Sequence, residues 1–93
     1  METRPNLIEE HLGLAQVIAV DYLNIPGATL GEVLSDAYEA LTRAAEGFNP
    51  AKGDFQPYAA RAIRNALNTL YHKQLRLAKM FPKLIGAPET GPD

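Results

Sequence analysis

The sequence predicts an all-α fold in which three main helices form a compact bundle. Apolar residues recur at helical spacing in three segments, and no segment alternates apolar and polar residues as a half-buried strand would. Short clusters that contain proline and glycine separate these segments. With 93 residues, the chain can bury roughly 60 to 65% of the surface that its unfolded form exposes. We therefore expect one domain with a hydrophobic core.

The first helix is expected over residues 7–23. Asn6 precedes the apolar-periodic run and Glu9 follows three residues later, a capping pair typical of a helix start. The apolar face of this helix carries Leu7, Ala15, Ile18 and Tyr22. His11 falls in the same arc, where a core histidine with a satisfied hydrogen bond is favoured over a metal ligand.

The second helix follows the loop NIPGA, in which Pro26 and Gly27 interrupt helical structure. Thr29 and Glu32 form a T-x-x-E capping box at its start, and Gly47 is its predicted stop signal. Its apolar arc consists of Leu30, Val33, Leu34, Ala37, Leu41, Ala44 and Phe48. The acidic residues Glu32, Asp36, Glu39 and Glu46 gather on the opposite side. This separation is typical of a helix with one face in a core.

The third helix is expected from about Phe55 to Met80, after the turn FNPAKGD. Pro50 breaks the preceding helix, Gly53 permits a sharp reversal, and Asp54 can cap the new helix. Pro57 is tolerated in the first turn, because an amide there has no intrahelical partner.

The two faces of the third helix differ in character. Its buried arc is expected to hold Ala59, Ile63, Ala66, Leu67, Leu70 and Leu77. The other side gathers Arg61, Arg64, Asn65, Asn68 and His72, with Tyr58 at the border. Such residues are suited to nucleic-acid contact, although a simply solvated face has the same composition. Pro82 ends the helix, so we expect a helical domain over residues 1–81 and a flexible tail over residues 82–93.

Composition excludes several classes of protein. The chain has no cysteine, which rules out disulfides and thiolate zinc sites. The apolar runs are far shorter than the about 20 residues that a membrane span needs, and no signal peptide is predicted, which favours a cytoplasmic protein. Catalytic triads, phosphate-binding loops and metal-ligand spacings are missing from the sequence, so no enzyme, cofactor or metal is expected.

Charge is distributed unevenly along the chain. Residues 1–48 contain two basic and eight acidic side chains, a net charge of -6, whereas residues 49–93 contain seven basic and three acidic ones, a net charge of +4. A basic half can meet phosphate and an acidic half can meet a basic protein surface.

The turn F-N-P-A-K-G and the helix start F-Q-P-Y-A-A-R-A-I-R-N-A-L carry a resemblance. Together with the two preceding helices, over roughly residues 6–75, the chain resembles region 2 of bacterial RNA polymerase sigma factors. This resemblance implies that the second helix docks on the clamp-helix coiled coil of the largest polymerase subunit. It also implies that the third helix binds the non-template strand of the minus-ten promoter element.

Individual roles follow from the same resemblance. Phe55 and Tyr58 match aromatics that stack on unpaired bases, a contact worth roughly 1 to 3 kcal/mol per base. The other DNA-binding positions are Arg61 and Arg64 at phosphates, and Asn65 and Asn68 at the upstream edge of the element. The polymerase-facing positions of the second helix are Glu32, Ser35, Asp36, Tyr38, Glu39 and Thr42.

Other hypotheses remain open. Arg61 and Ala62 stand where many family members have a tryptophan pair, and Ser35 and Tyr38 stand where Gln and Asn are common. One hypothesis is therefore a sigma-type initiation protein or a fragment of one. The alternative is a repurposed sigma-like module that binds a protein without reading promoter DNA, and an unrelated helical regulator is a third.

Overall fold

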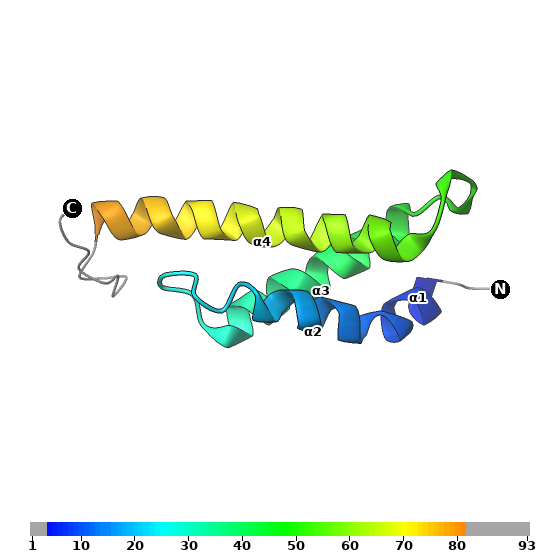
Figure 1. The fold of residues 1–93 in the computed structure, drawn as a ribbon, viewed down its shortest axis with the longest axis horizontal. Coiled ribbons are helices and arrows are strands. Elements are labelled where there is room, and N and C mark those ends of the chain that lie inside the picture. Colours follow the sequence, from blue (N-terminus) through cyan, green and yellow to red (C-terminus); the bar gives the residue numbers. More distant parts are fainter. Residues whose placement is uncertain (1–3, 82–93) are drawn as a thin grey trace.

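A computed structural model describes residues 4–81 of the chain. Within that range the elements are α1 (Arg4–Glu10), α2 (Leu12–Val20), α3 (Leu30–Gly47), the 3-10 helix η1 (Pro50–Lys52) and α4 (Phe55–Met80). No strand occurs in this part of the chain, and the all-α fold is confirmed (Figure 1). The expected tail over residues 82–93 lies outside the described residues.

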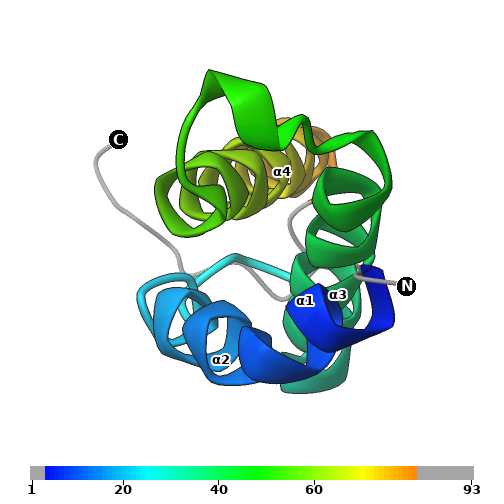
Figure 2. The ribbon, with the colours of Figure 1, turned by 90° about the vertical axis from the view of Figure 1, so that its right-hand side faces the viewer.

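The helices α2, α3 and α4 reverse direction from one to the next. α1 and α2 run along one edge of the molecule, α3 runs back beside them, and α4 reverses again along the opposite edge (Figure 1). Viewed nearly end-on, α2, α3 and α4 occupy three corners of a triangle, and each of them contacts the other two (Figure 2). Short connections favour such an arrangement, because consecutive elements then lie side by side.

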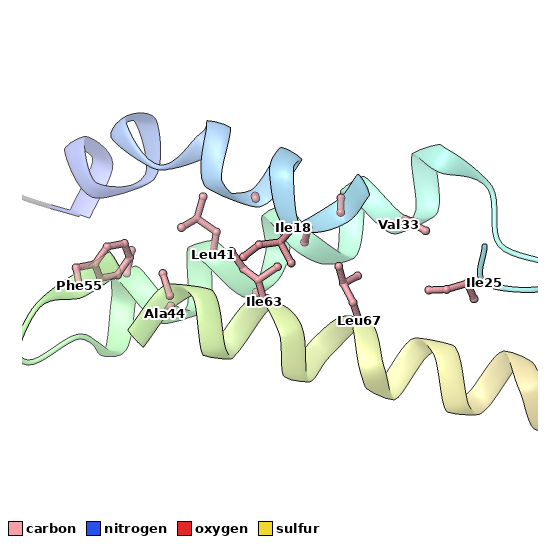
Figure 3. Close-up of a cluster of buried hydrophobic side chains, with 14 residues drawn as sticks. Ile18, Ile25, Val33, Leu41, Ala44, Phe55, Ile63 and Leu67 are labelled. Atoms are coloured by element: carbon pink, nitrogen blue, oxygen red, sulfur yellow. The ribbon is translucent and has the colours of Figure 1, made fainter. Parts of the chain in front are cut away.

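The core fills the space between these three helices (Figure 3). Its largest fully buried side chains are Ile18 from α2, Val33 and Leu41 from α3, and Ile63 and Leu67 from α4. The buried side of α3 also carries the small residues Ala37, Ala40, Ala44 and Ala45. Small side chains at the contacts allow the neighbouring helices to approach closely, because interaxial distance depends on side-chain size.

The first helix is interrupted at His11, which corrects the expectation of one continuous helix. The backbone N–H of His11 donates to Ile8 O at 3.1 Å, three residues back. The carbonyl of Leu7, which a regular helix would pair with that N–H, lies 2.8 Å from His11 Nδ1 instead. A carbonyl only accepts, so the ring nitrogen donates. A local side-chain bond of this kind competes with the helical ladder, which separates α1 from α2.

Two boundaries of this region also differ from expectation. α1 begins at Arg4, so Asn6 lies inside the helix and does not cap its start. α2 ends at Val20, because the amides of Asp21 and Tyr22 bond to carbonyls only three residues back. Bonds of this tighter type are common at helix termini.

The capping box at the start of α3 is confirmed. Thr29 Oγ1 accepts from the Glu32 amide at 3.1 Å, and a Glu32 carboxylate oxygen accepts from the Thr29 amide at 2.9 Å. Leu30, however, is 56% exposed, although the helical pattern placed it in the buried arc. The first buried residue of α3 is Val33. Periodicity predicts in which direction a side chain points, whereas burial also requires a neighbouring element to cover it.

Replacing Thr29 by Ala is expected to lower the free energy of unfolding by about 0.5 to 2 kcal/mol, because the Glu32 amide loses its acceptor. Thr29→Ser is the matched control, since it keeps the hydroxyl and should change stability much less. Urea unfolding followed by circular dichroism measures both values. Equal losses in the two variants would mean that the hydroxyl does not stabilise the start of α3.

The turn before α4 contains the predicted reversal. Asn49 Oδ1 accepts from the Ala51 amide at 3.0 Å at the start of η1. Gly53 has a φ of 132°, a conformation that glycine adopts without steric cost. Asp54 occupies the N-cap of α4, but its side chain makes no capping hydrogen bond. α4 then extends from Phe55 to Met80, as expected.

Candidate functional site

The charged side chains of α4 are all basic. Its basic residues are Arg61, Arg64, Lys73, Arg76 and Lys79, and residues 55–80 contain no aspartate or glutamate. Arg61 and Arg64 are both exposed. An uninterrupted basic helix of this kind attracts phosphate, because no nearby carboxylate on the same helix neutralises it.

Tyr58 forms an exposed aromatic surface at the beginning of α4. It is 44% exposed, and its ring lies 5.7 Å from that of Phe48 at the end of α3. The hydroxyl of Tyr58 would be 3.7 Å from a Cβ at position 47, so Gly47 and the tyrosine are close neighbours. The ring is therefore held against the end of α3, with its other parts open to solvent.

Phe55, in contrast, is a core residue, whereas the resemblance implies that it stacks on a base. It is 6% exposed. Its ring makes edge contacts with His11 at 4.8 Å and with Phe48 at 5.1 Å. Position 55 continues the buried stripe formed by residues 59, 63 and 67 at intervals of four. This spacing was readable from the sequence, and it indicates a core position.

Asn65 and Asn68 are both exposed but border different grooves. Asn65 lies at a groove of about 360 Å³ between α3 and α4. The residues that line this groove are Ala40, Arg43, Ala44, Tyr58, Ala62, Asn65, Ala66 and Thr69. Four of these residues are alanines. The other four are polar: Arg43 from α3, and Tyr58, Asn65 and Thr69 from α4. The sequence pattern predicts no role for Arg43, although it is one of the two basic residues among residues 1–48.

Asn68 borders a second groove of about 220 Å³. Its lining residues are Asp21, Tyr22, Asn24 and Ile25 from the end of α2 and the loop that follows, and Asn68 and Tyr71 from α4. The two asparagines, three positions apart on α4, are neighbours on its exposed side, yet each borders a different groove. The sequence assigned no function to Asn24 or Tyr71, since only the folded loop brings them together.

The acidic residues of α3 differ in the side-chain bonds that they form within the chain. Glu32 belongs to the capping box. Glu39 forms an ion pair with Arg43 at 2.6 Å, one turn further along the helix. Asp36 makes no side-chain hydrogen bond or ion pair within residues 4–81. Within residues 4–81, Asp36 and Glu46 are therefore the carboxylates of this face that no side-chain bond occupies.

Tyr38 and Thr42 lie to one side of this acidic face. The Tyr38 hydroxyl accepts from Gln16 Nε2 at 2.9 Å, which links α3 to α2. The Thr42 hydroxyl donates to the Tyr38 carbonyl at 2.9 Å. Both residues are half-buried. In the predicted polymerase-facing set, Ser35 and Glu39 are exposed, and Asp36 is half-buried but makes no side-chain bond within residues 4–81.

Neither metal clusters nor membrane spans are found in the described part of the chain. No three histidine, cysteine, aspartate or glutamate side chains between residues 4 and 81 are grouped so that they could hold a metal ion. None of the helices in that range combines the length and the apolar character needed to cross a membrane.

A family model described as sigma-70 region 2 matches residues 7–77. The chain belongs to the sigma-70 region 2 family. The match begins in α1 and extends into the last turns of α4, so it includes both grooves and both charged helices. Comparisons with curated proteins and with solved structures give no match.

Membership of the sigma-70 region 2 family confirms the resemblance found in the sequence. Domains of this family belong to sigma factors, which interact with RNA polymerase and promoter DNA in transcription initiation. The helical bundle, the turn before α4 and the basic residues of α4 are features of this sigma region 2 domain that the sequence predicted.

Proposed function

We propose that this sigma region 2 domain binds RNA polymerase core through the outward face of α3 and the non-template strand of the minus-ten element through α4. The observation that carries the proposal is the opposite charge of these two helices. α4 has basic but no acidic side chains, whereas α3 carries Glu32, Asp36, Glu39 and Glu46 against a single Arg43. Each helix therefore favours a different partner.

On the DNA side, Tyr58 stacks on an unpaired base, and Arg61 and Arg64 contact phosphates. The exposure of Tyr58 supports this role, because a base needs an accessible ring face. Phe55 is assigned a supporting role, since it lies beneath Tyr58 with ring centroids 6.3 Å apart. Asn65, which borders the groove between α3 and α4, reads a base edge.

On the polymerase side, Ser35, Asp36 and Glu39 form the contact surface. Asp36 has no partner among the described residues, so docking on a basic coiled coil would not first break an internal bond. Docking would break the exposed ion pair between Glu39 and Arg43 and replace it by a contact of Glu39 with the coiled coil. The loss is small, because exposed ion pairs contribute only about 0 to 1 kcal/mol. Tyr38 and Thr42 support the surface from the α2 side.

A second candidate function is polymerase binding without strand separation. It is favoured by Arg61 and Ala62, which replace the tryptophan pair of many family members. Ala62 lines the groove between α3 and α4 together with three further alanines, so the aromatic group that would act as a wedge is missing from this position. In this case the domain binds core and leaves promoter opening to another protein.

The double variant Asp36→Lys with Glu39→Lys is expected to weaken binding to purified bacterial RNA polymerase core by at least about tenfold, which corresponds to 1.4 kcal/mol. Reversal places like charges against the basic coiled coil and slows association. Surface plasmon resonance at two salt concentrations measures the change. Glu32 is left intact, because its replacement would also remove the cap of α3.

The matched control is Glu9→Lys with Glu10→Lys, which changes the net charge equally at exposed positions of α1. Binding equal to that of the parent is expected for this control. If both double variants weaken binding alike, the α3 surface is not the docking site. If the parent does not bind core at all, both candidate functions fail.

A further inference from the structure

The groove of about 220 Å³ beside the α2–α3 loop is lined by aromatic, amide and carboxylate side chains. Two tyrosine rings, Tyr22 and Tyr71, and two side-chain amides, Asn24 and Asn68, surround it. Asp21 is the only residue among the lining set that carries a charge. The groove therefore combines a carboxylate, aromatic rings and amide oxygens within one small space.

The walls of this groove are held in place by the core. Ile25, at the centre of the loop, is 4% exposed and joins the hydrophobic cluster (Figure 3). Gln74 Nε2 of α4 donates to Pro26 O at 3.2 Å, and the Ala28 amide donates to Ile25 O at 3.2 Å. Gly27 allows the tight turn with a φ of 76°. The loop is thus fixed to α4 before any ligand arrives, which lowers the entropic cost of binding.

The lining chemistry distinguishes between two kinds of ligand. A nucleotide would bring a phosphate towards Asp21, and no basic side chain lines the groove to offset the repulsion. A guanidinium group meets complementary partners instead: a carboxylate, amide oxygens that accept hydrogen bonds, and aromatic faces that attract cations. Arginine is better suited than lysine, since its planar group stacks on rings while its edges donate.

Exposed apolar residues of α2 and of the loop that follows it indicate which kind of residue would flank such an arginine in its own chain. α2 is apolar on nearly all sides, with Gln16 its only polar side chain. Val17 is 67% exposed, Val20 is 61% exposed and Leu23 is 47% exposed. A surface helix normally turns polar residues outward, so an apolar outer face on the helix that leads directly into Asp21 and Tyr22 of the groove is typical of a protein contact.

We propose that this groove binds an arginine side chain of a partner protein, and that apolar residues next to that arginine cover the outer face of α2. Asp21 pairs with the guanidinium, Tyr71 stacks on it, and Asn24 and Asn68 accept its remaining hydrogen bonds. Val17 and Val20 supply the apolar contact. The site is separate from the outward face of α3.

The test uses the chain labelled with ¹⁵N and an acetylated, amidated peptide of leucine and alanine with one central arginine. Side-chain amide signals of Asn24 and Asn68 are expected to shift saturably on titration. A peptide with citrulline in place of arginine keeps the shape but lacks the charge, and should bind about threefold to tenfold more weakly. Asp21→Asn should weaken arginine-peptide binding to a similar extent.

Two pairs of variants control this experiment. Glu10→Gln removes one exposed carboxylate elsewhere and should leave the peptide affinity unchanged. Tyr71→Phe keeps the ring and should retain binding, whereas Tyr71→Ala should lose it; circular dichroism checks that both remain helical.

The proposal is overturned if the citrulline peptide binds equally well, if Glu10→Gln acts like Asp21→Asn, or if the arginine peptide shifts neither amide at millimolar concentration. It is also overturned if a single-stranded oligonucleotide shifts both amides and Asp21→Asn strengthens that binding, because the groove would then hold a base.

Discussion

Replacing Leu41 by Ala is expected to lower the free energy of unfolding by about 2 to 5 kcal/mol. Leu41 has 0% exposure and belongs to the buried cluster that joins α3 to α2 and α4 (Figure 3). Removing its branched end leaves a cavity between three helices that are already in close contact through small residues. Chemical denaturation followed by circular dichroism gives the value directly, on the assumption of two-state unfolding.

Leu30→Ala is the matched control for this prediction. It makes the same chemical change in the same helix, but Leu30 is 56% exposed. Its expected effect is within about 0.5 kcal/mol, which is usual for surface positions. Similar small losses at both positions would show that α3 does not pack as described, and a large loss at Leu30 would indicate a partner on its surface.

Replacing Tyr58 by Ala is expected to weaken binding of an unpaired A/T-rich minus-ten strand by about 1 to 3 kcal/mol, since one base loses its stacking partner. The same strand in a duplex should bind less tightly to the parent and should respond less to the substitution. Fluorescence anisotropy with the two oligonucleotides measures these differences. Tyr58→Phe keeps the ring and is expected to bind as the parent does.

Arg64→Ala provides the contrast that separates stacking from charge. It should weaken all strands alike and reduce the salt dependence of binding, because one phosphate contact is lost. If Tyr58→Ala has no effect and Arg64→Ala has the same effect on every sequence, only general attraction to nucleic acid remains. Phe55→Ala is unsuitable for this comparison, because Phe55 lies in the core and its loss would destabilise the domain.

Local signals in the sequence predicted most of the helical elements. The box formed by Thr29 and Glu32 marked the start of α3, and Gly53 marked the reversal before α4. Both signals act through bonds or dihedral angles within a few residues, so they need no knowledge of the rest of the chain. The motif that follows this turn was also sufficient to predict the family, which the match over residues 7–77 confirms.

The sequence was less informative about which side chains are buried and where a helix is interrupted. Phe55 and Tyr58 both lie at the start of α4 and both match aromatic positions of the motif, yet one is buried and the other exposed. Leu30 has the right periodicity for the core but no element covers it. His11 interrupts its helix through a bond to Leu7, although nothing in the local pattern of apolar residues distinguishes it from a regular helical position.

The sequence by itself therefore determined the helical class, the order of the elements, the separation of acidic and basic halves and the family. These follow from periodicity, capping and composition, which are properties of neighbouring residues. Only the tertiary structure decided which side chains meet across elements: Phe55 with His11, Tyr38 with Gln16, and Asn68 with the α2–α3 loop. Such contacts depend on the distance and rotation between helices, and these are set by how side chains from several helices fill one core.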